Sequence, residues 1–333
     1  MKLFKTTILT LALLATATTY AQEAEATSEE TTEEPTFSVS GSIDTYYRSN
    51  REAPPTSFAD LPGFALGMAN IILSYEGEKH GFVADLVYGP RGEAAVFGSE
   101  GNGSSSIINQ LYAYYNISDK FTLTLGNFNT FLGYEVIAPA ANFNYSTSYM
   151  FSTGPFSHTG LKADIAISDD ISFMAAIMNT TDETEYAETD ETYFGLQLGL
   201  YGQYINLLSG DNYTQFDYTG GFNFSEKFYL GINATTTSLE GDAGFSGVAL
   251  YPQLALSDSF SLGFRGELFS TSDGTAADDL DLNAFTITGS FSSGNLIIKP
   301  EFRIDTASSE IFGDTAALED NISSFVLAAI YSF

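Results

Sequence analysis

The side chains best placed to do chemistry in this 333-residue chain are charges that occupy alternate positions of short segments. Two segments have this spacing: Arg265 with Glu267, and Lys299 with Glu301, Arg303 and Asp305. Residues two apart on an extended strand point to the same face, so these opposite charges would lie close together. Such a row can satisfy its own charges, or it can bias which ions pass beside it. The sequence leaves both roles open.

Catalysis and metal binding have few candidate residues. The chain has no Cys and two histidines, His80 and His158, and neither histidine lies in a nucleophile motif. Gly101-Asn-Gly-Ser lacks the lysine of a phosphate loop. The acids within 182–191 do not have EF-hand spacing, so diffuse attraction of cations is the better interpretation. We predict no catalytic residue, no metal site and no cofactor.

The charge balance excludes nucleic acid as a partner. Twelve basic side chains face 42 acidic ones, which gives a net charge of −30, and no basic run exists. Phosphate backbones are bound by clustered Lys and Arg. With 44% hydrophobic residues, the chain is nevertheless too apolar to stay unfolded along its whole length.

The N-terminal residues are predicted to lie outside the folded domain. Residues 1–21 combine Lys2 and Lys5 with the apolar run 8–15 and end at Ala21, as a secretory signal peptide does. Residues 22–36 are acidic and lack apolar periodicity, which predicts a solvated tail. The domain organisation is therefore a signal peptide (1–21), an acidic tail (22–36) and a folded domain (37–333).

From residue 37 to the end, apolar and polar residues alternate with period two in blocks of about ten residues. Short turns such as 118–121, 168–171, 225–228 and 257–260 separate some blocks. Longer polar connections separate others: 51–63, 90–106, 136–153, 181–191, 238–244, 272–281 and 306–321. This favours an all-β, antiparallel, up-and-down barrel of about sixteen strands, with short periplasmic turns and long extracellular loops. Fourteen or eighteen strands also fit, because the turn near Gly202 is inferred from one glycine and its position.

A barrel of that size has a lumen too wide for wall side chains to fill, so we expect its inside to be wet and its apolar face to contact a lipid bilayer. The polar face then supplies the predicted pore-lining charges: Asp44, Arg48, Asp85, Arg265, Glu267, Lys299, Glu301, Arg303 and Asp305.

Two further segments carry predictions of their own. The connection 136–153 is long enough to fold inward and narrow the lumen, with Tyr145, Tyr149 and Phe151 as the constricting side chains. The last strand ends on Tyr331 and Phe333, the kind of terminus that outer-membrane assembly machinery is thought to read.

Several motifs together resemble one family of outer-membrane proteins of Gram-negative bacteria. They are Ser40-Gly-Ser-Ile-Asp-Thr-Tyr-Tyr47, Gly126-Asn-Phe-Asn-Thr-Phe-Leu-Gly-Tyr-Glu135, Asn144-Tyr-Ser-Thr-Ser-Tyr149 followed by Gly160-Leu161, Glu301-Phe-Arg-Ile-Asp305 and Tyr331-Ser-Phe333. Their order and spacing are similar to those of the β-barrel porin-2 (OmpL-like) family. The resemblance implies an outer-membrane barrel and passive transport, and it supplies no catalytic residues.

The expected function is therefore passive diffusion of small hydrophilic solutes or ions, with cations or neutral solutes preferred because of the acidic charge. The alternative is a plugged barrel whose extracellular loops bind a surface partner. Either protein could form a homo-oligomer, and the sequence does not decide this.

Overall fold

The computed structural model describes residues 35–96, 105–185, 191–274, 279–314 and 317–333. The predicted signal peptide and residues 22–34 of the predicted tail lie outside the described residues.

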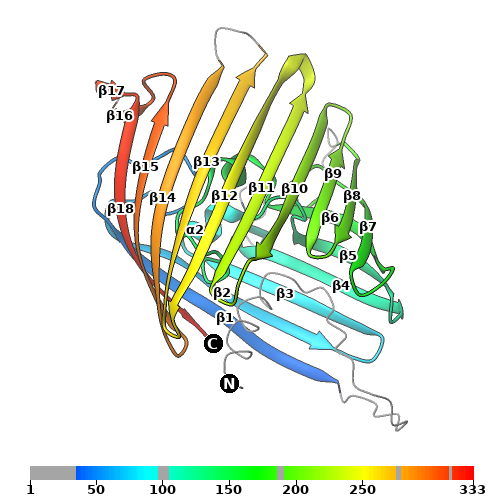
Figure 1. Cartoon of the computed structure of the whole chain (residues 1–333). Coiled ribbons are helices and arrows are strands. Elements are labelled where there is room, and N and C mark those ends of the chain that lie inside the picture. Colours follow the sequence, from blue (N-terminus) through cyan, green and yellow to red (C-terminus); the bar gives the residue numbers. More distant parts are fainter. Residues whose placement is uncertain (1–34, 97–104, 186–190, 275–278, 315–316) are drawn as a thin grey trace.

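Sixteen antiparallel strands close into one barrel (Figure 1). The first eight are β1 (Thr36–Arg48), β2 (Gly63–Glu76), β3 (His80–Tyr88), β4 (Ile108–Ser118), β5 (Phe121–Asn129), β6 (Ser157–Ala166), β7 (Ile171–Met178) and β8 (Tyr193–Leu200). The others are β9 (Gln203–Ser209), β10 (Tyr213–Asn223), β11 (Phe228–Leu239), β12 (Ala243–Ser257), β13 (Phe260–Asp273), β14 (Leu280–Ser293), β15 (Leu296–Ala307) and β18 (Asn321–Ser332). Pairing of β1 with β18 closes the ring in a register that places Ser42 opposite Ser332. The predicted fold class and strand number are confirmed.

The remaining elements are short and lie in the connections. They are α2 (Pro90–Ala95), η1 (Ser105–Ile107), α3 (Tyr149–Thr153), η2 (Glu240–Asp242) and a small hairpin of β16 (Phe312–Asp314) with β17 (Ala317–Glu319). Within the described residues, no helix has the length and apolarity needed to cross a membrane.

Short and long connections alternate for most of the chain, with one difference from the sequence-based expectation. The turn near Gly202 is confirmed: Leu200 pairs with Gln203, and Tyr201 and Gly202 adopt φ angles of 53° and 76°. The predicted long connection 238–244 is wrong, because β11 and β12 continue into it and leave only Glu240–Asp242 between them. Gly241, at φ 77°, allows the chain to reverse in so few residues.

The two faces of the wall have opposite polarity, as predicted. On β13, Arg265 and Glu267 are 0% and 2% exposed, whereas Leu268 on the opposite face is 59% exposed. Phe216 and Phe285 on other strands are also more than half exposed. Hydrocarbon is the solvent that covers such a face favourably, and closure of the sheet pairs the backbone groups that hydrocarbon cannot.

Protein segments fill part of the barrel interior, contrary to the expectation of a lumen that is wet throughout. The connections 49–62, 89–96 and 130–156 enter it, and Figure 1 shows α2 inside the ring of strands. They build apolar clusters against inward-facing wall residues, for example Tyr145 with Ile297 and Ala328. The alternating pattern could not reveal this, because it reports which face a side chain points to and not what fills the space beyond.

Candidate functional site

The connection between β5 and β6, residues 130–156, is here called the inward loop. Its three predicted aromatic residues, Tyr145, Tyr149 and Phe151, are 0%, 3% and 8% exposed. The Tyr145 hydroxyl donates to Asp44 on β1, and the Tyr149 hydroxyl donates to Asp305 on β15 at 3.0 Å. The loop therefore reaches inward-facing side chains of the wall. That it constricts a solute path stays a prediction.

Two wall carboxylates each bind a pair of adjacent backbone amides of the inward loop. Glu301 accepts hydrogen bonds from the N–H groups of Tyr145 and Ser146 at 2.7 and 2.9 Å. Glu267 does the same for Tyr149 and Met150 at 2.9 and 2.8 Å. A loop inside a barrel has no strand neighbour for its amides, and a charged acceptor forms a stronger bond than a neutral one. These carboxylates supply the partners that such a buried loop requires.

Wall cations bind the carbonyl groups of the same loop. Arg265 donates to the Ser146 carbonyl at 2.6 Å, and Arg303 donates to the Thr147 carbonyl at 2.6 Å. Lys299 donates to the carbonyls of Pro139, at 3.0 Å, and Asn142. Acidic and basic side chains of the wall thus hold both kinds of backbone group. We call this set of wall side chains, Asp44, Arg265, Glu267, Lys299, Glu301, Arg303 and Asp305, the clamp.

The other two predicted pore-lining charges lie outside the clamp. Arg48 binds the connection 49–62 by donating to the carbonyls of Arg51 and Leu61 at 3.2 and 3.4 Å. Asp85 accepts hydrogen bonds from Asn109 of β4 and Asn70 of β2 at 2.7 and 3.2 Å, so both partners belong to the wall. All nine predicted charges point inward and are at most 4% exposed. Their role in lining a pore stays a prediction.

Two charged residues that the sequence did not single out complete the arrangement. Glu135 of the inward loop pairs with Arg265 at 2.6 Å and accepts the Ser148 amide at 2.7 Å. Arg91 of α2 donates to the Tyr145 carbonyl at 3.1 Å, and its guanidinium lies 4.7 Å from the Tyr145 ring centroid. Both residues are in connections without periodicity, so no sequence signal indicated that they face the interior.

Wall glycines accommodate side chains of the inward loop. A Cβ atom on Gly263 of β13 would lie 2.3 Å from Cε1 of Phe143. A Cβ atom on Gly231 of β11 would lie 2.3 Å from the hydroxyl oxygen of Tyr134. Real Cβ atoms cannot approach so closely, so the loop aromatics fill space that only glycine leaves open. The wall and the loop are therefore complementary in shape as well as in charge.

The wall formed by β8, β9, β10 and β11 differs from the clamp because Asp217 is its one charged residue. Its inward side chains are mainly amides and hydroxyls, among them Asn206, Gln215, Asn233 and Thr235. Asp217 accepts hydrogen bonds from Asn206 and Asn233 at 2.8 and 2.7 Å and from the Gly133 amide at 3.0 Å. This carboxylate is fully engaged by neutral donors.

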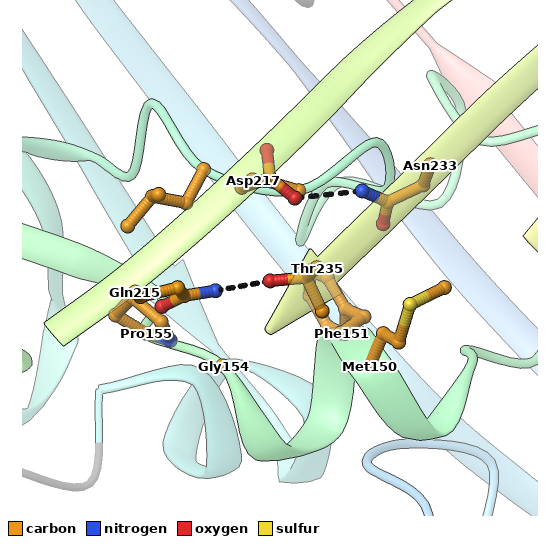
Figure 2. A pocket seen from close by; sticks show the side chains of 10 residues that line it. Met150, Phe151, Gly154, Pro155, Gln215, Asp217, Asn233 and Thr235 are labelled. Carbon is orange, nitrogen blue, oxygen red and sulfur yellow. Dashed lines mark hydrogen bonds between the residues drawn. The ribbon is translucent and has the colours of Figure 1, made fainter. Parts of the chain in front are cut away.

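A small hollow of about 10 Å³ lies between this wall and the inward loop. Figure 2 shows Gln215 and Asp217 of β10 beside Thr235 and Asn233 of β11, with Met150 and Phe151 of α3 across from them. We call this junction of the inward loop with β10 and β11 the seam. Its volume suits about one water molecule.

The far end of the inward loop is held by Asp182, in the connection that follows β7. Its carboxylate accepts the amides of Phe156 and Ser157 at 2.7 and 2.9 Å. Burial raises the pKa of Asp182 to about 6, and the two amide bonds oppose that shift. The sequence suggested diffuse cation attraction for the acids of 182–191, whereas Asp182 has this defined structural role; residues 186–190 lie outside the described residues.

The histidines are placed near opposite rims. His80 is the exposed first residue of β3, next to a short turn, and His158 is fully buried beside the inward loop, where its Nε2 shares a hydrogen bond with the Thr130 hydroxyl at 2.9 Å. In the part of the chain that the structure describes, no three His, Asp or Glu side chains come together in a way that could hold a metal ion.

The outward aromatic residues of the C-terminal strand complete the ring. Tyr331 and Phe333 are 45% and 53% exposed, and the backbone of Phe333 exchanges hydrogen bonds with Gly41 at 3.0 and 3.1 Å. Recognition of this terminus during assembly stays a prediction.

A sequence model of the family described as beta-barrel porin-2, OmpL-like, matches residues 36–333. The chain belongs to this family. Porins of this family are outer-membrane barrels, which agrees with the polarity of the two wall faces. Among curated proteins, none matches the chain.

Solved outer-membrane proteins share the fold at low sequence identity. A loop-deletion form of OmpT of Vibrio cholerae has a TM-score of 0.58 at 11% identity, covering 90% of this chain and 100% of its own. The outer-membrane channel DcaP of Acinetobacter baumannii has a TM-score of 0.58 at 11% identity, with coverage of 90% and 97%. The anion-selective porin of Comamonas acidovorans has a TM-score of 0.57 at 10% identity, with coverage of 90% and 100%. At these identities the likeness concerns the fold alone.

Proposed function

We propose that this porin lets small hydrophilic solutes diffuse passively across the outer membrane, through a lumen narrowed by the inward loop. The observation that carries the proposal is the closed sixteen-strand barrel with an apolar outer face, an inward polar face and a loop bound inside. No reaction is required for this function, only a path whose lining decides which solutes enter.

The clamp has a structural role in this proposal. Its charges are almost completely covered by protein, and their partners include amides, carbonyls and tyrosine hydroxyls of the inward loop. Charges in such bonds contribute less field to a solute path than charges facing water. We therefore assign the clamp to holding the constriction in place, and of the two roles that the sequence left open we propose that of charges satisfied by protein groups.

Deletion of residues 140–150 tests the constriction. If the inward loop narrows the lumen, the single-channel conductance of the refolded deletion variant in planar lipid exceeds that of the wild type several-fold. An unchanged conductance would exclude the loop from the solute path.

Preference for cations or neutral solutes over anions is the second part of the proposal. The Comamonas porin is anion-selective on the same fold, so selectivity has to be argued from the residues. Here the net charge is −30, which attracts cations and repels anions. A reversal potential in a KCl gradient measures the preference, and a sign that indicates anion selectivity would overturn it.

A plugged barrel that binds a surface partner through its loops is the second candidate function. It is favoured by the close filling of the interior, where the seam has about 10 Å³ of free volume. The same recordings separate the two functions. A porin conducts as the wild type, whereas a plugged barrel is silent as the wild type and conducts after deletion of residues 140–150.

Export and assembly are further parts of the proposal. Residues 1–21 are proposed to direct secretion and to be removed, and Tyr331 with Phe333 are proposed to be read by the assembly machinery. A homo-oligomer is proposed as well, since the OmpT of Vibrio cholerae has a trimer form. Crosslinking of the protein in native outer membranes measures the number of copies.

A further inference from the structure

We propose that solutes cross the level of the inward loop at the seam, and that the seam takes uncharged solutes carrying several hydroxyl groups, such as sugars and polyols. This inference rests on the proposed porin function and adds to it a path and a class of solute.

The path is placed by the unequal strength of the contacts around the inward loop. On the clamp side, Arg265, Glu267 and Glu301 bind the loop backbone through charge-assisted hydrogen bonds of 2.6 to 2.9 Å. Such bonds, between groups that are fully buried, are costly to break. The loop is therefore fixed on this side, and a solute would have to unfold it to find space there.

On the opposite side the contacts are longer and mostly neutral. Gln197 of β8 donates to the Phe131 carbonyl at 3.2 Å, and Tyr134 donates to the Tyr229 hydroxyl at 3.4 Å. The charged contact on this side is the bond from the Gly133 amide to Asp217, at 3.0 Å. A modest displacement of residues 131–134 from the wall would widen the hollow that already exists there.

The lining of the seam determines the class of solute. Gln215, Asn233 and Thr235 offer amide and hydroxyl groups from the wall, while Met150 and Phe151 offer apolar groups from the loop (Figure 2). Leu132 of the loop adds a third apolar side chain to the lining. A sugar ring has hydroxyl groups around its perimeter and apolar C–H faces, so it matches a slot with one polar and one apolar side. A site without a free charge gives no compensation to an ion that sheds its water.

Asp217 does not convert the seam into a cation filter. Its two oxygens already accept hydrogen bonds from Asn206, Asn233 and the Gly133 amide. The carboxylate orients the two amides of the wall. A neutral solute in the seam therefore meets no charged group that lacks a hydrogen-bond partner.

The absence of native cysteine allows the path to be tested by single-cysteine labelling. Thr235 faces the seam, and its neighbour Thr236 is exposed on the outer face of the same strand, so Thr235→Cys and Thr236→Cys are a matched pair. Both variants are recorded in planar lipid before and after a bulky, neutral thiol reagent, so that wild-type conductance before labelling reports correct folding. We expect labelling to reduce the conductance of Thr235→Cys by at least about half and to leave Thr236→Cys unchanged.

The outcomes separate this inference from the proposed function. A wild type that does not conduct overturns the porin function itself. A wild type that conducts, with Thr235→Cys that stays unlabelled or that conducts equally after labelling, leaves the porin intact and overturns the path along the seam.

The solute class is tested with Gln215→Leu and Asp217→Asn in liposome-swelling and reversal-potential measurements. We expect Gln215→Leu to slow the uptake of arabinose about five- to tenfold relative to its KCl conductance, as loss of a hydrogen bond to the solute would do. Asp217→Asn is expected to leave the K⁺ to Cl⁻ permeability ratio within about twofold of the wild type, because the carboxylate is already engaged. Equal effects on sugar and salt, or a larger loss of cation preference, would overturn the assignment to neutral solutes.

Discussion

The two halves of the barrel wall use the same alternating pattern for different purposes. On β15, Lys299, Glu301, Arg303 and Asp305 occupy successive inward positions, and every one of them is at most 2% exposed. On β8 to β11, Asp217 is the one charged residue, and amides and hydroxyls fill the other polar positions. The charged half binds the inward loop, and the neutral half meets it at the seam. If the proposed path is correct, charge density inside this barrel marks where protein is held, and not where solute passes.

The largest test of this contrast is Arg265→Met. The substitution leaves Glu135 buried without its ion-pair partner, and removes the donor to the Ser146 carbonyl. We expect a loss of about 3–5 kcal/mol of unfolding free energy, as for other buried pairs broken on one side. Denaturant unfolding in lipid vesicles measures it, and a loss below about 1 kcal/mol would show that the clamp does not stabilise the folded barrel.

Asp182, which holds the far end of the inward loop, provides a test that depends on pH. Its pKa is raised by burial to about 6, above the value of 3.8 for an exposed carboxyl. The folded state therefore binds the proton more tightly than the unfolded state, and the contribution to stability rises as the pH falls from above 6 toward 4. We expect the wild type to gain up to about 3 kcal/mol relative to Asp182→Asn over this range. Unfolding at pH 7.5 and pH 4.5 measures the difference, and parallel pH profiles of the two proteins would contradict the assignment.

Gly263→Ala tests the shape complementarity between the inward loop and the clamp side. The new Cβ would lie 2.3 Å from Cε1 of Phe143, so we expect a loss of about 1–3 kcal/mol and a higher conductance. Gly266→Ala on the same strand is the matched control, because its Cβ would meet nothing within 4 Å. Adding Phe143→Ala to Gly263→Ala should recover part of the loss, and no recovery would mean that the loop does not pack there.

The smallest effect is expected from Lys162→Met. Lys162 and Asp164 form an ion pair of 3.2 Å on β6, with side chains 20% and 30% exposed, so water screens them. We expect a stability change within about 1 kcal/mol. Because Asp164 is then unpaired beside solvent, the reversal potential in a KCl gradient should move toward cation preference. A stability loss as large as that of Arg265→Met would erase the distinction between clamped and solvent-facing pairs.

The wall could be predicted from the sequence because strand alternation is a local property. The segment 260–268 places Arg265 and Glu267 opposite Phe264 and Leu268, and the structure has them so. The length of the connection 238–244 was predicted wrongly, because polar residues such as Thr and Ser also occur at the end of a strand. The inward positions of Arg91 and Glu135 could not be predicted, because Tyr145 and Arg265, which they respectively bind, are more than forty positions away along the chain.

The sequence by itself determined the strands, their inward and outward faces, and the approximate number of strands, because each follows from a period of two residues and from the polarity of the medium on either side. The tertiary structure alone decided what the inward charges bind. Closure of the ring brings β1, β13 and β15 around the inward loop, and the partners of a charge inside a closed barrel depend on which distant segment enters the space it faces.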